Sequence, residues 1–292
     1  MADTPRLDHV QCLDNRGLHR MAYWTWGRPD HPHAVVCAHG LTRQGLDFDT
    51  LARSLIDGDR CRVVGVDVVG RGRSDWLADP MGYQVPQYVA DMVTLLARLN
   101  APTVDWVGTS MGGLIGLGVA ALPGSPLRRF VVNDIGPTLD QAGIERIGQY
   151  VGRPARWATL DEAADALWAI SQGFGPHTRE QWLELTRPQL VDDGEGGFKP
   201  HYDPAIAVPF RAITPEIAAA GEALLWQSYD RLRCPTLLLR GAESDLLSRE
   251  TALAMTQRGP KATLVEFAGV GHAPTLVQPE QRQAVRDFLL AP

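Results

Sequence analysis

The sequence predicts an α/β fold, a mostly parallel β-sheet covered by helices on both faces. Short apolar runs typical of buried strands alternate with segments of helical periodicity, and such alternation indicates a parallel sheet. Two alternating segments precede them, His9–Leu13 and Leu18–Trp26, and the turn residues 14–17 between the two indicate an antiparallel hairpin. The length of 292 residues fits one large domain with an insertion better than two equal domains.

The remaining elements of the sheet layer follow in chain order. Continuous apolar runs predict fully buried strands at Ala34–Ala38, Arg62–Val66, Val104–Val107, Phe130–Val132, Thr236–Leu239 and Thr263–Phe267. Apolar residues at helical spacing predict the helices between them at Asp47–Ile56, Val85–Leu99, Met111–Leu122, Ser248–Gln257 and Pro279–Leu290.

The alternation stops after the strand at Phe130–Val132. Residues 137–230 carry helical patterning without a convincing buried strand, and a loop rich in Gly, Asp and Pro lies near 192–204. We therefore predict a core domain made of residues 1–136 and 231–292, with a helical cap (lid) over residues 137–230. Such a cap forms the roof of an active site and selects what enters it.

Composition excludes several classes of partner. The net charge of -6 gives no reason to expect nucleic acid or an anionic membrane as a partner. The first residues lack the apolar core of a signal peptide, and no run approaches the length of a membrane span, so we expect a cytoplasmic protein. The four scattered cysteines predict reduced core thiols rather than a metal site, and we expect no cofactor. The sequence leaves open whether the chain forms a homo-oligomer.

The most informative motif is Gly108-Thr109-Ser110-Met111-Gly112-Gly113, which lies between a predicted strand and a predicted helix. A G-x-S-x-G turn holds its serine in a strained conformation at the end of the strand, with the hydroxyl exposed. The glycines allow the strand and the helix to pack closely. We predict Ser110 as a nucleophile; the alternative is a glycine-rich turn whose serine caps the helix.

A serine nucleophile needs a base, and the base needs an orienting acid. His272 follows the last predicted strand, within Gly271-His272, and is the expected base. Asp245 follows the preceding strand and is the expected acid, with Asp134 and Glu243 as alternatives in the same region. The chain order serine, acid, histidine matches that of α/β-hydrolases.

An acyl-transfer site also needs donors for the oxyanion. The backbone N–H of Met111 follows the nucleophile at the start of a helix, and the N–H of Leu41 lies in the loop after the strand at Ala34–Ala38. These two amides are the predicted oxyanion hole. His39 in the same loop is interpreted as a structural residue that holds this loop.

These motifs, together with the turn Asp67–Ser74, resemble those of the α/β-hydrolase superfamily. They are similar to its capped serine hydrolases, a branch with esterases, carbon–carbon bond hydrolases and cofactor-free haloperoxidases. The resemblance implies an eight-stranded sheet with a helical lid inserted after the sixth strand. The resemblance implies that superfamily members that cleave carbon–halogen bonds or epoxides have aspartate at the position of Ser110. The serine found here therefore argues against both activities.

The expected function is hydrolysis of a carboxylic ester of a small to medium molecule through an acyl-enzyme. The alternatives are a carbon–carbon bond hydrolase acting on a diketo acid and a non-catalytic ligand-binding protein. Arg43 could pair with a substrate carboxylate, although a solvent-facing arginine is the simpler interpretation. Trp168 and Trp182 are the predicted substrate-binding aromatics, from a larger cap set that includes Tyr150, Trp157, Phe174 and Trp226.

Overall fold

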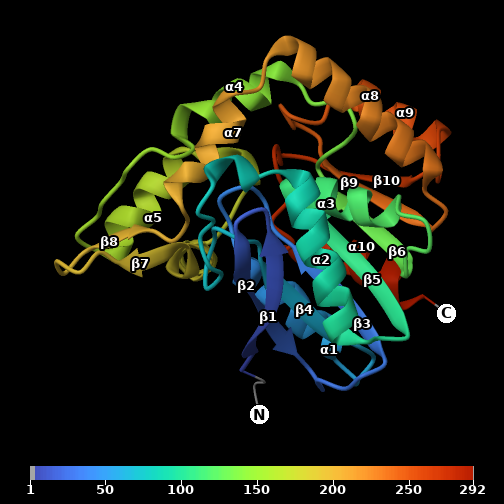
Figure 1. Cartoon of the computed structure of the whole chain (residues 1–292), viewed down its shortest axis with the longest axis horizontal. Helices are drawn as coiled ribbons and strands as arrows, with labels where there is room; N and C mark the ends of the chain where they lie inside the picture. Colours follow the sequence, from blue (N-terminus) through green and yellow to red (C-terminus); the bar gives the residue numbers. More distant parts are fainter. Residues whose placement is uncertain (1–3, 292) are drawn as a thin grey trace.

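The protein is described by a computed structural model for residues 4–291, with a central sheet and a cap over one end of its strands (Figure 1). The strands are β1 (Arg6–Asp14), β2 (Gly17–Trp26), β3 (His33–Ala38), β4 (Arg62–Asp67), β5 (Thr103–Thr109), β6 (Leu127–Asn133), β7 (Leu190–Asp192), β8 (Phe198–Pro200), β9 (Thr236–Gly241) and β10 (Thr263–Phe267). The α-helices are α1 (Asp49–Ile56), α2 (Val85–Leu99), α3 (Met111–Ala120), α4 (Gln141–Tyr150), α5 (Leu160–Ala169), α6 (Arg179–Thr186), α7 (Ala207–Arg211), α8 (Pro215–Arg231), α9 (Arg249–Gln257) and α10 (Pro279–Leu290).

Within residues 4–291, eight strands form the central sheet in the order β1-β2-β4-β3-β5-β6-β9-β10. β1 pairs antiparallel with β2 and β2 antiparallel with β4, whereas the remaining neighbours are parallel. The predicted hairpin, the mostly parallel sheet and the excursion after the sixth strand are therefore confirmed. The parallel strands end at one common edge, and this edge brings together loops that are far apart in the chain.

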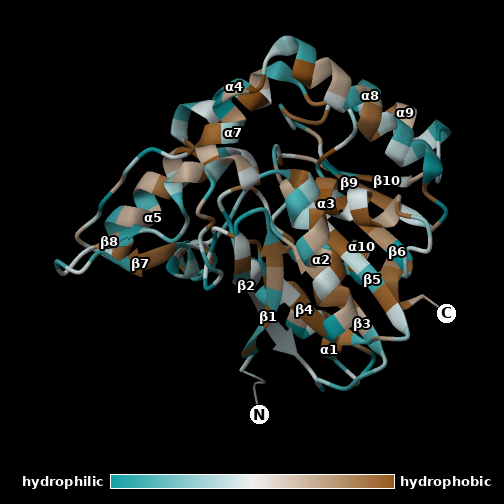
Figure 2. Cartoon of the chain, in the orientation of Figure 1, coloured by the Kyte–Doolittle hydropathy of each residue, from teal (hydrophilic) through white to brown (hydrophobic). Residues whose placement is uncertain are grey.

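Both faces of the sheet are buried, which explains the continuous apolar runs. Val36 and Val64 pack on one face with residues of α2 and α3, whereas the alternate residues Val35 and Val63 pack on the other face with α1 and α10. Figure 2 shows the hydrophobic colouring concentrated on the central strands and on α3. Each fully buried aliphatic side chain stabilises the fold by about 1.5–3 kcal/mol relative to an exposed one.

The segment between β6 and β9 is mostly helical, as expected, but it also contains a small two-stranded sheet. β7 and β8 pair antiparallel across the Gly- and Asp-rich segment in which the sequence predicts a loop. The strands are too short, with three residues each, to give a recognisable alternating pattern. Figure 1 places β7 and β8 with α4, α5 and α7 beyond one end of the central sheet.

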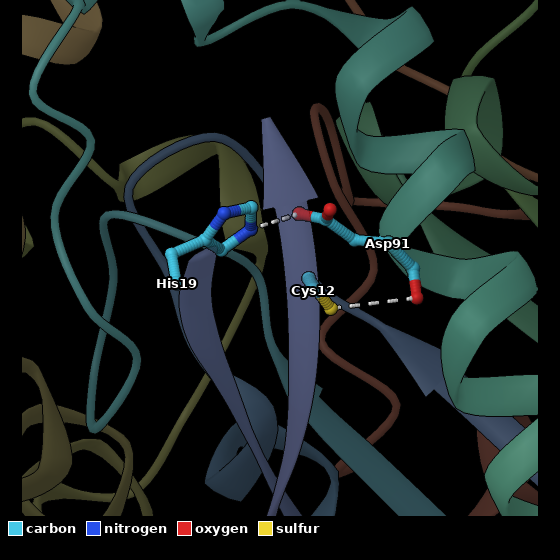
Figure 3. A group of neighbouring side chains, drawn as sticks. All are labelled: Cys12, His19 and Asp91. Carbon is cyan, nitrogen blue, oxygen red and sulfur yellow. Dashed lines mark hydrogen bonds and ion pairs between the residues drawn. The ribbon is translucent and has the colours of Figure 1, made fainter. Parts of the chain in front are cut away.

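A buried polar group joins the N-terminal hairpin to α2. His19 Nε2 lies 3.1 Å from Asp91 Oδ2, and Cys12 Sγ lies 4.0 Å from the backbone oxygen of Asp91 (Figure 3). All three side chains are buried. The contact ties β1 and β2 to a helix that also packs against α3.

Candidate active site

Ser110 lies at the turn between β5 and α3, in a strained conformation with φ 52° and ψ -119°. The turn depends on its glycines, because a Cβ at Gly112 would overlap the backbone oxygen of Ala38. A Cβ at Gly108 would likewise overlap the backbone of Gly112. The close contact between strand and helix thus explains why small residues flank the serine.

Ser110, His272 and Asp134 form a continuous chain of hydrogen bonds. His272 Nε2 lies 2.9 Å from Ser110 Oγ, and His272 Nδ1 lies 2.8 Å from Asp134 Oδ2. The ring of His272 is buried, with 8% of its surface exposed, and Asp134 is fully buried. The structure brings together the predicted nucleophile and base in hydrogen-bonding contact.

The orienting acid differs from the prediction: the structure places Asp134, and not Asp245, against the His272 ring. The Asp134 carboxylate also accepts hydrogen bonds from the Gly241 amide at 2.8 Å and from the Ser244 hydroxyl at 2.6 Å. These donors hold the carboxylate against Nδ1 of the imidazole ring. The loop predicted to supply the acid supplies instead two donors that orient it.

Asp245 points toward the cap. Its carboxylate accepts two hydrogen bonds from the Arg146 guanidinium of α4, at 2.5 and 2.9 Å. The hydrogen bonds from Arg146 lower the pKa of Asp245, which keeps the pair charged. The assignment of Asp245 as the acid is therefore wrong in this structure, because a residue of the cap binds its carboxylate. Asp134, an alternative from the sequence, takes this position.

A buried guanidinium links the two residues of the predicted oxyanion hole. Arg71 donates to the backbone oxygen of Leu41 at 2.8 Å and lies 3.5 Å from Met111 Sδ. It also donates to the backbone oxygen of Val69 and to the hydroxyl of Tyr88. The arrangement fixes both residues relative to the turn after β4. In the sequence Arg71 is one residue of the turn Asp67–Ser74, and no local pattern shows that its side chain contacts other loops.

His39 has the structural role expected from the sequence. Its Nε2 accepts a hydrogen bond from the Val68 amide at 3.0 Å, while Nδ1 donates to the Gly40 oxygen at 2.7 Å. Burial, together with the nearby charges of Arg71 and Arg43, lowers the pKa of His39 to about 3. The ring is therefore neutral at pH 7 and joins the loop after β3 to the loop after β4.

Neutral His39 makes the stability of the protein sensitive to acid. Below pH of about 6.5 the unfolded chain binds a proton on this histidine that the folded chain excludes. The contribution of neutral His39 to the free energy of unfolding is complete above that pH and is lost as the pH falls toward 3. Between pH 7 and 5 we expect the free energy of unfolding to fall by about 2 kcal/mol from this residue.

Urea unfolding of the wild type and of His39→Gln at both pH values measures the effect. Glutamine retains an acceptor for the Val68 amide but does not titrate, so the fall in stability should be smaller in the variant. An equal fall in both proteins would contradict this interpretation.

A cavity of about 230 Å³ opens above Ser110 and His272, between the sheet edge and the cap. Among the residues that the structure describes, five Phe, Tyr or Trp side chains line it, namely Phe48, Tyr150, Trp157, Phe174 and Tyr202. Three of them belong to the cap set named from the sequence, and Phe48 and Tyr202 were missed. The rest of the lining mixes aliphatic residues such as Leu41 and Leu167 with polar and charged ones, including Ser110 and His272.

Trp168 and Trp182 do not line this cavity among the described residues, so their prediction as substrate-binding residues is wrong. Their rings pack edge to face, with centroids 5.0 Å apart, and Trp182 Nε1 donates to the backbone oxygen of Ala164. They form the core between α5 and α6. A tryptophan in a cap is more easily explained by the cap's own packing than by ligand contact.

Arg43 lines the cavity, but its charge is neutralised. Its guanidinium donates to both carboxylate oxygens of Asp47, at 2.6 and 3.0 Å, and lies 5.7 Å from the centre of the Phe174 ring. Gln189 also donates to Asp47. The sequence left two interpretations of Arg43 open, a solvent-facing residue and the partner of a substrate carboxylate. The structure shows neither, because Arg43 lines the cavity and is bound to Asp47.

The cap segment after β8 is fixed to the core by polar contacts. The Gly72 amide donates to the His201 oxygen, and the Asp203 amide donates to the Gly70 oxygen. The Tyr83 hydroxyl lies 2.5 Å from Asp203 Oδ2, and Asp203 is buried. The cap segment that contains His201 and Asp203 is therefore hydrogen-bonded to the turn that contains Arg71.

The one group of neighbouring metal-type ligands found among residues 4–291 is Cys12, His19 and Asp91, whose ligand atoms lie within 4.8 Å of one another. Sequence spacing did not reveal it, because the three residues lie on different elements. Structural zinc takes four ligands, and the two oxygens of Asp91 are already bonded to His19 and to Gln87. The group is best described as a structural ion pair beside a buried thiol.

Comparison with known proteins agrees with this geometry. Residues 35–287 match the alpha/beta hydrolase family. The chain belongs to that family. It is similar to the 3-hydroxybutyrate-oligomer hydrolase of Cupriavidus necator, with 57% identity over 286 residues and 96% of each chain covered. It is also 26% identical to the 2-(acetamidomethylene)succinate hydrolase of Mesorhizobium japonicum over 254 residues, 86% of each chain.

Among solved structures, an alpha/beta hydrolase from Novosphingobium aromaticivorans superposes with a TM-score of 0.84 at 34% identity, over 98% of this chain and 99% of that one. The predicted superfamily and fold are confirmed. The relatives also support the predicted class of enzyme, a carboxylic-ester hydrolase. Within the described residues, no helix has both the length and the apolar character needed to cross a bilayer. The cytoplasmic location and the cap bounds stay predictions.

Proposed function

We propose that this protein hydrolyses the ester bonds of short oligomers of 3-hydroxybutyrate or a closely similar hydroxy acid, through an acyl-enzyme on Ser110. The observation that carries the proposal is the hydrogen-bonded series Ser110–His272–Asp134 at the floor of a capped cavity. The choice of substrate is supported by the 57% identity to a 3-hydroxybutyrate-oligomer hydrolase over nearly all of both chains.

In the first half of the reaction, Ser110 Oγ attacks the ester carbonyl while His272 Nε2 accepts the serine proton. Asp134 accepts the Nδ1–H of the ring and stabilises the imidazolium that forms. The imidazolium then donates its proton to the departing alkoxide as the carbon–oxygen bond breaks. The alcohol fragment leaves, and the acyl group stays on Ser110.

The oxyanion of each tetrahedral intermediate is stabilised by the backbone amides of Leu41 and Met111. The Met111 amide lies at the N-terminus of α3, where the helix dipole also favours negative charge. Arg71 positions both residues through its contacts with the Leu41 oxygen and the Met111 sulfur. Water, deprotonated by His272, then attacks the acyl group and regenerates the serine.

The size and lining of the cavity favour a short, mainly apolar substrate. A volume of about 230 Å³ is below the usual range for drug-sized ligands. Aliphatic and aromatic walls suit the methyl and methylene groups of a hydroxybutyrate unit. Arg43, which the diketo-acid alternative invoked as the carboxylate partner, is bound to Asp47, so that alternative would need another cation of the cavity.

The test is hydrolysis of synthetic 3-hydroxybutyrate dimers and trimers by the purified full chain, with release of monomer followed by chromatography. We expect turnover of both oligomers and of short p-nitrophenyl esters, and labelling of Ser110 by a fluorophosphonate. Faster turnover of a diketo acid than of any ester would overturn the choice of bond. If the protein shows neither turnover nor labelling of Ser110, the proposed hydrolase activity is wrong and the alternative of a non-catalytic ligand-binding protein is favoured.

A further inference from the structure

Of the residues that the structure describes, three arginines line the cavity above Ser110: Arg43, Arg146 and Arg153. Two of them form bidentate ion pairs with carboxylates. Arg43 binds Asp47, and Arg146 binds Asp245. Each of these pairs contributes no net charge to the cavity.

Arg153 differs from both. It lies in the segment between α4 and α5, and its backbone amide donates to the Tyr150 oxygen. Its side chain is exposed and lines the cavity, and no carboxylate within residues 4–291 forms an ion pair with it. In contrast, Arg156 in the same segment binds Asp193 and Glu195 and lies outside the cavity lining. Arg153 therefore supplies the uncompensated positive charge of the cavity.

An unpaired guanidinium on the wall of a ligand cavity suits a carboxylate, which it can bind with two parallel hydrogen bonds. An oligomer of a hydroxy acid carries one free carboxylate, at the end opposite its free hydroxyl. We propose that Arg153 binds this terminal carboxylate and so selects anionic oligomers over neutral esters. The inference rests on the proposed hydrolysis of oligomers at Ser110.

The chemistry of the oligomer fixes the step in which Arg153 acts. When Ser110 attacks any ester bond of the chain, the acyl fragment retains the free hydroxyl end. The carboxylate end departs with the alcohol oxygen, which takes its proton from His272. Arg153 therefore contributes to binding and to acylation. The acyl-enzyme no longer contains the carboxylate, so its hydrolysis by water does not involve Arg153.

The experiment compares a 3-hydroxybutyrate trimer that ends in a free carboxylate with the same trimer ending in a neutral carboxamide. For the wild type we expect kcat/KM to be about tenfold higher for the carboxylate form, since a charge-assisted hydrogen bond is lost with the amide. In Arg153→Gln this preference should disappear through a rise in KM for the carboxylate form. The carboxamide form and p-nitrophenyl 3-hydroxybutyrate should be hydrolysed at unchanged rates.

Arg156→Gln is the matched control, because it removes a neighbouring exposed arginine outside the cavity lining; it should retain the preference. Activity of Arg153→Gln on the carboxamide form shows that the variant is folded. If Arg153→Gln retains the tenfold preference, or if the wild type has none, the assignment of Arg153 is wrong while ester hydrolysis stands. If the wild type hydrolyses neither trimer nor the p-nitrophenyl ester, the proposed function itself fails.

Discussion

Ser110→Ala should lower kcat for ester hydrolysis by about 10⁵–10⁶-fold, the scale on which a serine protease responds to loss of its nucleophile. Without the hydroxyl no acyl-enzyme forms, and only the oxyanion donors and substrate binding assist attack by water. The fold should be unaffected, because the one described side-chain partner of Ser110 Oγ is the ring of His272. Steady-state kinetics on a 3-hydroxybutyrate trimer, with intact-mass detection of acyl-enzyme in the wild type, measures the effect.

Thermal unfolding of Ser110→Ala is the control for its fold, and the midpoint should match that of the wild type within a few degrees. A variant that unfolds normally yet retains more than a tenth of wild-type activity would show that the nucleophile lies elsewhere.

Asp134→Asn should lower kcat by about 10⁴-fold, since an amide in this position favours the wrong tautomer of the histidine. The asparagine can donate to Nδ1, which then leaves the proton on Nε2 and removes the acceptor that Ser110 needs. The substitution preserves size, and the Gly241 amide can still donate to the side-chain oxygen. The kcat of the variant on short esters measures the loss.

Asp245→Asn is the matched control for Asp134→Asn, because both substitutions remove a carboxylate at the same sheet edge. Asp245 binds Arg146 in a pair that is about one-third exposed, so its loss should cost no more than about 1 kcal/mol of stability. We expect kcat to change less than tenfold. A larger loss for Asp245→Asn than for Asp134→Asn would reverse the assignment of the acid.

The pattern of strands predicts at which sheet edge the catalytic acid lies, but it does not distinguish Asp134 from Asp245. Asp134 follows β6 and Asp245 follows β9, and these two strands are adjacent in the sheet. Both carboxylates therefore start from the same edge at which β5 delivers Ser110. Which of them faces His272 depends on Arg146, a residue of the cap that binds Asp245, and on Gly241 and Ser244, which bind Asp134.

The lining of the cavity shows the same limitation for the cap. The sequence predicts that the cap is helical, and α4 and α5 lie within the segment that carries helical patterning. Local sequence periodicity does not show which face of each cap helix lies toward the cavity or how the aromatic side chains of the cap pack. Trp168 and Trp182 pack against one another, whereas Tyr150 and Phe174, on other elements of the cap, face the cavity.

The sequence by itself determined the order of strands and helices in the central layer, the interruption after β6, and Ser110 and His272 as nucleophile and base. These features depend on local periodicity and on glycines that a tight strand-to-helix turn requires, so neighbouring residues suffice to reveal them. Tertiary structure alone decided the partner of His272, the neutralised state of Arg43 and Arg146, and the free charge of Arg153. Those depend on which side chains meet across loops distant in the chain, and no local pattern records such encounters.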